Sequence, residues 1–222
     1  MKKTKLILLR HGQSAWNKEN LFTGWVDIPL SEQGILESVE AGKQIAQQPI
    51  DLVFTSTLVR AHMTTALALL QHASGRVPVF QHPGQPWSAL HGQTDRTVPV
   101  FMAEALNERM YGELQGLNKA ETAKKFGDKQ VHLWRRSFDV APPGGESLQM
   151  TAERTLPYFR KTILPHVQQG KNVLISAHGN SLRSIVMHLE KLSPQEVVAL
   201  EIATGQPIVY HCENGHDFTR CP

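Results

Sequence analysis

The chain has 222 residues, 41% of them hydrophobic and 19% charged, which is enough apolar content for a large buried core. No apolar run approaches the roughly 20 residues of a transmembrane helix, and no signal peptide opens the chain, so we expect a cytoplasmic protein without a membrane partner. The net charge of +3 is small and its lysines and arginines are dispersed, which argues against nucleic acid as a partner.

The first half of the chain alternates between strand and helix patterns. The continuous apolar run from Lys5 to Leu9 predicts a strand buried on both faces. Strands are also predicted at 51–55 and 76–80, with a helix at 58–70 between them. An earlier helix is predicted over 30–48, with Ser31 as its N-cap. Its buried face is predicted to contain Ile35, Val39, Gly42, Ile45 and Ala46.

The order βαβαβ predicts an α/β fold with three layers, in which helices flank both faces of a mostly parallel sheet. From Gln81 to Thr97 prolines and glycines occur without a period, and we interpret 81–103 as an irregular loop insertion in a single domain spanning 1–222.

The second half of the chain contains longer helical patterns. Helices are predicted at 118–126, at 128–138 and over 147–169, where Pro157 and Pro165 should kink or divide the long one. A buried strand at 172–178 precedes a helix, and the last strand is "PIVYHC". That helix is predicted to bury Leu182, Ile185, Leu189 and Leu192.

Two predicted strands end in the same way. "LILLRHG" runs into His11 and Gly12, and "VLISAHGN" runs into His178 and Gly179. Ligands of open α/β sheets bind beyond the carboxyl ends of the strands, so neighbouring parallel strands would bring the two histidines together. A third strand delivers Thr55, Ser56 and Arg60 to the same edge.

An edge with two histidines and two arginines, Arg10 and Arg60, suits a phosphoryl group. Guanidinium groups match phosphate oxygens, and a neutral imidazole nitrogen can attack phosphorus or take a proton. This chemistry requires no metal, and the sequence lacks a P-loop, an H-E-x-x-H and a C-x-x-C motif. The spacing of His211, Cys212, His216 and Cys221 fits no ordinary zinc site, and Asn214-Gly215 is typical of a hairpin turn, so we interpret both cysteines as free thiols.

Simpler interpretations exist for each motif taken alone. A single histidine after a strand is usually structural, and a second such strand is what favours a site. The segment "LNERMYGELQG" could be a charged surface, although Glu108, Arg109 and Tyr111 around a glycine also suit an acid/base element. "WRRSF" is typical of a solvated helix face, because adjacent arginines point about 100° apart and serve one anion only near a helix end or across a broad site.

Several dispersed blocks resemble one known family. "LLRHGQSAWNKENLFTGWVDIPLSEQG", "FTSTLVRA", "LNERMYGELQGLNKAET", "LWRRSF", "ESL", "SAHGNSLR" and "TGQPIVY" are similar, in order, to blocks of the cofactor-dependent phosphoglycerate mutases within the histidine phosphatase superfamily. The resemblance covers most of the chain outside 72–104 and the last ten residues. Longer relatives have more residues between "PP" and "ESL" and a C-terminal tail over the site, and the sequence leaves open how this chain covers it.

The resemblance implies a role for each matched residue. His11 would be the nucleophile, Glu108 the proton donor and acceptor, and Arg10, Arg60 and His178 the residues that hold the transferring phosphoryl group with help from Asn17. The implied substrate-binding positions are Asn17, Thr23, Gly24, Arg60, Glu108, Arg109, Tyr111, Lys119, Arg135, Arg136, Gly179 and Asn180.

The implied reaction interconverts 3-phosphoglycerate and 2-phosphoglycerate, in glycolysis and gluconeogenesis, through a phosphohistidine enzyme. Bound 2,3-bisphosphoglycerate would be the phosphoryl primer, no metal would take part, and a homo-oligomer, with a dimer favoured, is expected. Two alternatives remain: a phosphatase of the same superfamily that acts on a small phosphorylated metabolite, and a non-catalytic module that binds a phosphorylated ligand. The second would tolerate loss of His11, which is present.

Overall fold

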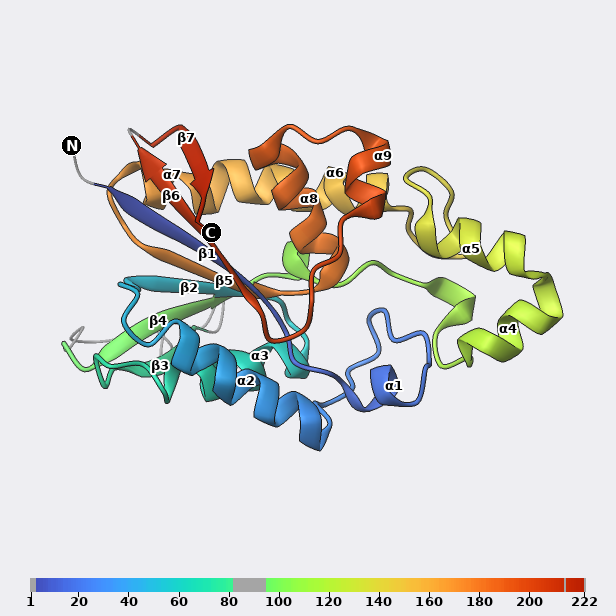
Figure 1. Ribbon diagram of the computed structural model, residues 1–222, viewed down its shortest axis with the longest axis horizontal. Coiled ribbons are helices and arrows are strands. Elements are labelled where there is room, and N and C mark those ends of the chain that lie inside the picture. The colour runs from blue at the N-terminus through green and yellow to red at the C-terminus, as the bar shows by residue number, and fades with distance from the viewer. Residues whose placement is uncertain (1–2, 82–94, 214, 222) are drawn as a thin grey trace.

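The computed structural model describes residues 3–81, 95–213 and 215–221, and within these ranges its strands form one seven-stranded sheet (Figure 1). The strands are β1 (Thr4–Arg10), β2 (Leu52–Thr55), β3 (Val77–Gln81), β4 (Thr97–Met102), β5 (Val173–Ala177), β6 (Pro207–Glu213) and β7 (Asp217–Arg220). Their spatial order is β3-β4-β2-β5-β1-β6-β7. The first five are parallel to one another, whereas β6 and β7 are antiparallel, so the predicted mostly parallel sheet is confirmed.

The helices lie on both faces of this sheet and beyond one of its ends (Figure 1). They are α1 (Ala15–Lys18), α2 (Glu32–Gln44), α3 (Val59–Leu69), α4 (Lys119–Phe126), α5 (Asp128–Arg136), α6 (Leu148–Tyr158), α7 (Leu164–Gln168), α8 (Gly179–Glu190) and α9 (Pro194–Ala199). The described residues also form two short 3-10 turns, η2 (Glu104–Leu106) and η3 (Gly112–Leu114), and one π-helical turn, η4 (Phe159–Ile163).

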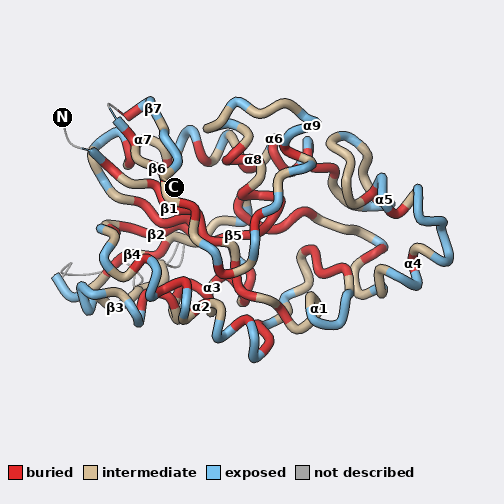
Figure 2. Tube along the Cα trace, viewed as in Figure 1, coloured by how far each residue is buried: buried red, intermediate tan, exposed pale blue. Residues whose placement is uncertain are grey.

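Strand β1 is continuously apolar because both of its faces are buried. Successive side chains of a strand point to opposite faces, and Leu6 and Leu8 pack in the core beneath α6, η4, α7 and α8. Ile7 and Leu9 pack in the second core, which contains residues of α2 and α3. Both faces of the central strands are therefore buried, as Figure 2 shows in red, and the three-layer prediction is confirmed.

Helix α2 begins as predicted, and its buried face agrees with the prediction in part. The Ser31 hydroxyl accepts a hydrogen bond from the Gly34 amide at 3.1 Å and caps the helix. The predicted Gly42 and Ile45 are buried, whereas the predicted Ile35 is 37% exposed and Ser38, which was not predicted, is buried. A Cβ at Gly42 would lie only 2.4 Å from the carbonyl oxygen of Ala68 on α3. The two helices approach so closely that small residues, rather than large apolar ones, form the contact.

The interpretation of 81–103 as irregular is wrong for its last part. Residues Thr97–Met102 form β4, which pairs in parallel with both β2 and β3. Val98 and Val100 are buried, but Pro99 between them cannot donate a backbone hydrogen bond, which disguises an interior strand. Residues 82–94 lie outside the described part of the chain.

The long helical segment is divided near both prolines, as predicted. Pro157 lies inside α6, the chain continues through the π-helical turn η4, and Pro165 lies in the first turn of α7. A proline offers no amide hydrogen to the helix ladder, and the local pattern changes around it. The predicted strand at 172–178 and the helix after it are confirmed as β5 and α8, and "PIVYHC" lies in β6. Helix α9 has no counterpart among the predicted helices.

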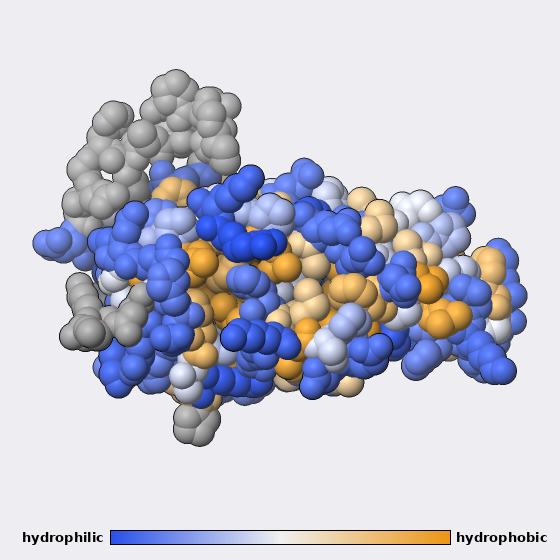
Figure 3. Space-filling model, turned by 90° about the horizontal axis from the view of Figure 1, so that it is seen from above, coloured by the Kyte–Doolittle hydropathy of each residue, from blue (hydrophilic) through white to orange (hydrophobic). Residues whose placement is uncertain are grey.

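The surface shows two further features. Among the described residues, no helix has both the length and the apolar character needed to cross a bilayer. On the face seen in Figure 3, hydrophobic side chains lie between hydrophilic ones over most of the surface.

Candidate active site

The ends of β1 and β5 bring the two predicted histidines into contact. Arg10 pairs with Ala177 in the parallel ladder, and the next amide, that of His11, donates to the Ala177 carbonyl at 3.0 Å. The imidazole rings of His11 and His178 lie 4.9 Å apart between centroids, and both residues are buried. The predicted meeting of two distant histidines at one sheet edge is confirmed.

His11 is arranged as a neutral imidazole. Its Nδ1 lies 2.6 Å from the Gly12 carbonyl oxygen, which can only accept, so Nδ1 carries the hydrogen and Nε2 carries the lone pair. Burial, followed by the charges of Arg60 and Arg10, holds the pKa of His11 well below its usual value. A Cβ at Gly12 would lie 2.2 Å from the Gly34 carbonyl oxygen, so only glycine fits after this histidine.

His178 is oriented through Ser56, which follows β2. The Ser56 hydroxyl lies 2.7 Å from Nε2 of His178 and also accepts a hydrogen bond from the Leu58 amide. The Ser56 hydroxyl keeps its own hydrogen to donate to Nε2, an arrangement consistent with a ring hydrogen on Nδ1 of His178. Burial, then the charge of Arg60, lowers the pKa of His178 well below its usual value, so this ring is also neutral.

Two arginines provide positive charge beside these rings. Arg60 is almost fully buried and donates to the carbonyl oxygens of Gly24 at 2.7 Å and Val26 at 3.0 Å, which occupies two of its five N–H groups. Burial lowers its pKa to about 10, and it stays protonated at neutral pH. Arg10 donates from Nη1 to the Ile202 carbonyl at 2.7 Å.

Glu108 lies opposite these cations as an ionised carboxylate. Its Oε1 accepts from the Arg109 amide at 2.8 Å and from the Asn180 amide and side chain at 3.1 and 2.9 Å. Burial alone would raise its pKa, but the Arg109 amide, the charge of Arg10 and the Asn180 side chain lower it below the usual value. In the described part of the chain all three bonds go to Oε1, which leaves Oε2 to exchange a proton with a ligand.

The outer part of the same cleft is formed by the ends of α4 and α5. Lys119 is the first residue of α4, and Arg135 and Arg136 are the last two of α5. This placement at a helix end is what allows adjacent arginines to serve one cleft. Burial, then the charges of Arg135 and Arg10, lowers the pKa of Lys119 to about 8.

Almost all the predicted site residues line one cleft of about 160 Å³. The predicted residues in its wall are Arg10, His11, Asn17, Thr23, Gly24, Arg60, Glu108, Tyr111, Lys119, Arg135, Arg136, Gly179 and Asn180. His178 lies against the ring of His11. Asn17 also helps to fix this wall, because its Oδ1 accepts from the Ser14 amide at 3.2 Å and closes a capping box at α1.

Arg109 differs from its predicted role in substrate binding. It is buried behind the wall of the cleft, where its Nη2 donates to the Tyr111 hydroxyl at 2.8 Å and to the Arg135 carbonyl at 3.0 Å. The guanidinium therefore supports two residues that face the cleft. The resemblance implied direct contact with a ligand, whereas the Arg109 side chain bonds to Tyr111 and Arg135.

Two charged residues of the cleft, Arg183 and Glu201, were not predicted from the sequence, and neither were the apolar Leu21, Phe22 and Ile202. Arg183 lies on α8, one turn after Asn180, and that spacing could have indicated it. Glu201 carries no comparable signal. Its carboxylate lies 2.7 Å from Nη1 of Arg136 and 3.7 Å from Nη2 of Arg183, so it links two cations of the outer cleft.

The cleft fits a ligand with more than one anionic group. Arg10 Nε, Thr23 Oγ1 and His178 Nδ1 are buried without a hydrogen-bond partner among the described residues, although such groups usually have one. Cationic side chains line the cleft from Arg10 and Arg60 at its inner end to Arg135 and Arg136 at its outer end. The outer arginines are only partly neutralised, by Glu201, and can bind an anionic group. A bisphosphate would supply acceptors at both ends. Within the described ranges, no group of three or more His, Cys, Asp and Glu side chains is placed to hold a metal ion.

Comparison with known proteins gives a consistent result. The family model of the histidine phosphatase superfamily (branch 1) matches residues 6–84 and 88–220. A 2,3-bisphosphoglycerate-dependent phosphoglycerate mutase of Protochlamydia amoebophila is 61% identical over 212 residues, covering 93% of this chain and 94% of the relative. One of Chlamydia trachomatis serovar L2b is 60% identical over 220 residues, covering 98% and 97%.

Solved structures share the fold at lower identity. "Mycobacterial hydrolase 1" superposes with a TM-score of 0.77 at 22% identity, covering 99% of this chain and 97% of the other. A mycobacterial glucosyl-3-phosphoglycerate phosphatase complexed with VO3 superposes with a TM-score of 0.75 at 23% identity, covering 98% and 97%.

Proposed function

Because the chain belongs to the histidine phosphatase superfamily (branch 1), we infer that it catalyses the reaction of its 61% and 60% identical relatives. Its activity is that of a 2,3-bisphosphoglycerate-dependent phosphoglycerate mutase, EC 5.4.2.11, a glycolysis-related isomerase of 3- and 2-phosphoglycerate. The observation that best supports this activity is the length of the cationic cleft, from the neutral imidazole of His11 to Arg135 and Arg136. A mutase must bind two anionic groups at once, whereas a phosphatase needs only one.

His11 is the proposed nucleophile. The lone pair on Nε2 attacks phosphorus, so that a P–N bond forms while the P–O bond to the substrate oxygen breaks. Arg10 and Arg60 stabilise the negative charge on the phosphoryl oxygens, and Nδ1–H of His178 provides a further buried donor. When bound, 2,3-bisphosphoglycerate supplies the phosphoryl group that loads His11.

Glu108 is the proposed acid and base. As a carboxylate held through Oε1, it takes the proton of the substrate hydroxyl that receives the phosphoryl group. The same proton returns to the oxygen that gives up its phosphoryl group to His11. Lys119, Arg135 and Arg136 are proposed to bind the carboxylate and the second phosphate, and this keeps the substrate in the cleft while it reorients.

One coupled assay tests the function. The rate of 2-phosphoglycerate formation from 3-phosphoglycerate is measured with and without 2,3-bisphosphoglycerate and with a chelator, while free phosphate is monitored. We expect stimulation by the bisphosphate, no effect of the chelator and little phosphate release. Rapid phosphate release without 2-phosphoglycerate would instead identify the phosphatase alternative, and loss of activity with chelator would contradict a metal-free reaction.

We also propose that the enzyme works in the cytoplasm as a homodimer. Leu70, just after α3, and Val77 at the start of edge strand β3 are 68% and 54% exposed, and α3 packs against β3. Exposed apolar side chains beside the edge strand of a sheet suit a surface that associates with a second copy of the chain. Light scattering after size-exclusion chromatography should give about twice the mass of the chain, and Leu70→Glu should reduce it to one chain. A monomeric wild-type protein would refute the dimer.

The cytoplasmic location is tested separately by cell fractionation, in which the enzyme should appear in the cytoplasmic fraction.

A further inference from the structure

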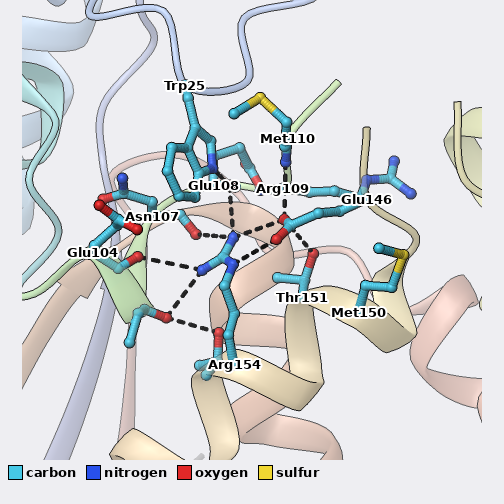
Figure 4. Close-up of polar contacts among 12 residues, drawn as sticks. Trp25, Glu104, Asn107, Glu108, Arg109, Met110, Glu146, Met150, Thr151 and Arg154 are labelled. Atoms are coloured by element: carbon cyan, nitrogen blue, oxygen red, sulfur yellow. Dashed lines mark hydrogen bonds and ion pairs between the residues drawn. The ribbon is translucent and has the colours of Figure 1, made fainter. Parts of the chain in front are cut away.

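The loop that carries Glu108 is held from behind by Arg154 of α6 (Figure 4). Its guanidinium group donates to four backbone carbonyl oxygens of this loop between residues 104 and 108. The N–O distances are 3.4 Å to Glu104, 3.0 Å to Ala105, 3.0 Å to Asn107 and 2.8 Å to Glu108. One side chain therefore fixes the backbone from η2 to the acid/base residue itself.

Glu146 completes this arrangement on the other side of Glu108. Its Oε1 accepts from Nε of Arg154 at 2.8 Å, and its Oε2 accepts from Nη2 at 2.9 Å. Oε2 also accepts from the Met110 amide at 3.0 Å, two residues after Glu108. The side chains of Arg154 and Glu146 are only 21% and 17% exposed, so this ion pair is largely shielded from water. The pair holds the chain on both sides of the acid/base residue.

Neither member of the pair lines the cleft. Both bond to backbone and to each other, Glu146 also accepts from the Thr151 hydroxyl, and the Arg154 guanidinium lies 5.4 Å from the centroid of the Trp25 ring. Trp25 adds a third contact at the same point, because its Nε1 donates to the Glu108 carbonyl at 2.5 Å. We propose that Arg154 and Glu146 are positioning residues that fix the carboxylate of Glu108 for proton transfer, an inference that rests on the proposed mutase reaction.

The guanidinium group is required for geometric reasons. It is planar, with five N–H donors in a fixed fork, and here it bonds to carbonyls on one side and to a carboxylate on the other. A lysine at position 154 keeps the charge but offers three donors from a single nitrogen, which cannot reach the same set of acceptors. The loop would then shift, and a displacement of about 1 Å at a reacting group costs roughly 100-fold in rate.

The pH dependence provides a readout specific to this role. The groups facing Glu108 are Arg10 from β1, Arg60 from α3 and Arg183 from α8, besides the Asn180 side chain. Burial raises the pKa of Glu108, and the hydrogen bonds with these charges lower it. A displaced loop loses the hydrogen bonds first, so the pKa rises and the acid limb of kcat moves to higher pH.

The experiment compares Arg154→Lys and Glu146→Gln with the wild-type enzyme under primed mutase conditions. We expect kcat to fall about 100-fold for Arg154→Lys and about 10-fold for Glu146→Gln, with KM changed less than about threefold and the acid limb moved upward. The matched control is Arg160→Lys in η4, an exposed arginine whose Nε donates to the Leu156 carbonyl. It should behave as wild type.

A double-mutant cycle with Glu108→Gln separates positioning from general stability. In that background the positioned carboxylate is absent, so Glu146→Gln should cause little further loss of kcat. Thermal unfolding accompanies every variant, and if Arg154→Lys does not fold, Glu146→Gln decides alone. The proposal would be overturned if Glu146→Gln lowered kcat as much in the Glu108→Gln background as in the wild type, or if the acid limb of kcat did not move. A change confined to the melting temperature or to KM would also overturn it. The wild-type enzyme is assayed in parallel. If the wild type shows no mutase activity, the proposed reaction is contradicted, and this outcome is distinguishable from a failure of the positioning role.

Discussion

The two ends of the cleft are built differently. At the inner end, His11, His178 and Arg60 are 3%, 0% and 1% exposed, and each follows a strand of the central sheet or starts the helix after it. At the outer end, Lys119 and Arg136 lie at the ends of short helices and are only half-buried. The inner end is suited to fixing reacting atoms, and the outer end to binding and releasing charged groups of a substrate.

The supporting cores differ in the same way. Leu8 of β1 belongs to a large core that joins the sheet to the helices above it. Helix α5 rests on a small cluster of four buried residues, Phe22, Leu114, Val131 and Trp134. A site held within about 0.5 Å needs a rigid support, which the sheet provides. We therefore expect changes at the inner end to affect the chemical step and changes at the outer end to affect binding.

The largest effect is expected at the inner end, for His11→Ala. Without the Nε2 lone pair no P–N bond forms, so mutase activity should fall at least about 10⁴-fold. Acid-labile labelling of the protein by 2,3-bisphosphoglycerate should disappear. His132→Ala, an exposed histidine of α5, is the control and should label normally. Labelling that persists in the first variant would place the nucleophile elsewhere.

The outer end should respond differently to Arg135→Gln. The loss of one charge-assisted hydrogen bond, worth about 1.5 to 3 kcal/mol, should raise KM by roughly 10-fold or more while kcat changes little. Labelling of His11 should be retained at saturating bisphosphate. Lys129→Gln, on the exposed side of α5, controls for the change in net charge. If kcat fell and KM did not change, the division between the two ends would be wrong.

The inner end was also the more predictable of the two. The continuous run at Leu6–Leu9 determines a buried strand, and parallel strands necessarily align their carboxyl ends, so His11 and His178 could be brought together from sequence alone. The roles of Lys119 and Arg135 came from the resemblance to a family, because the long-range placement of helix ends leaves little local signal. The residues around Glu108 suited an acid/base element by themselves.

Other features could not be predicted for identifiable physical reasons. The strand at 97–102 contains Pro99, and proline usually excludes an interior strand. The buried face of α2 depends on how closely α3 approaches Gly42, which no pattern on one helix reveals. Arg154 bonds to backbone carbonyl groups, which every residue has. No residue type in the sequence of the Glu108 loop therefore indicates this contact.

The outer end should also show its own pH dependence, through Lys119. The free enzyme's pKa for this ammonium is about 8, so it is charged below that pH and becomes neutral as pH rises through it. We expect kcat/KM, which reports the free enzyme, to decline above about pH 8. Lys119→Met should lower kcat/KM several-fold at pH 7 and abolish that alkaline limb. An unchanged limb in the variant would assign it to another group.

The smallest effect is expected for Glu201, because this residue competes with the ligand for the outer cations. Its carboxylate pairs with Arg136 at 2.7 Å, yet it is 66% exposed, and exposed ion pairs contribute at most about 1 kcal/mol. Glu201→Gln should therefore lower KM by about fivefold at most, with kcat unchanged. Glu213→Gln, which removes an exposed pair with Lys3 instead, is the matched control.

Salt sharpens this last comparison. Screening weakens the Arg136–Glu201 pair in the wild type, so the difference in KM between wild type and Glu201→Gln should shrink as ionic strength rises from about 0.05 M to 0.5 M. A higher KM in the variant at low salt would mean that Glu201 orients Arg136 for the ligand. In that event the outer end would be pre-organised like the inner one, and the contrast between them would rest on burial alone.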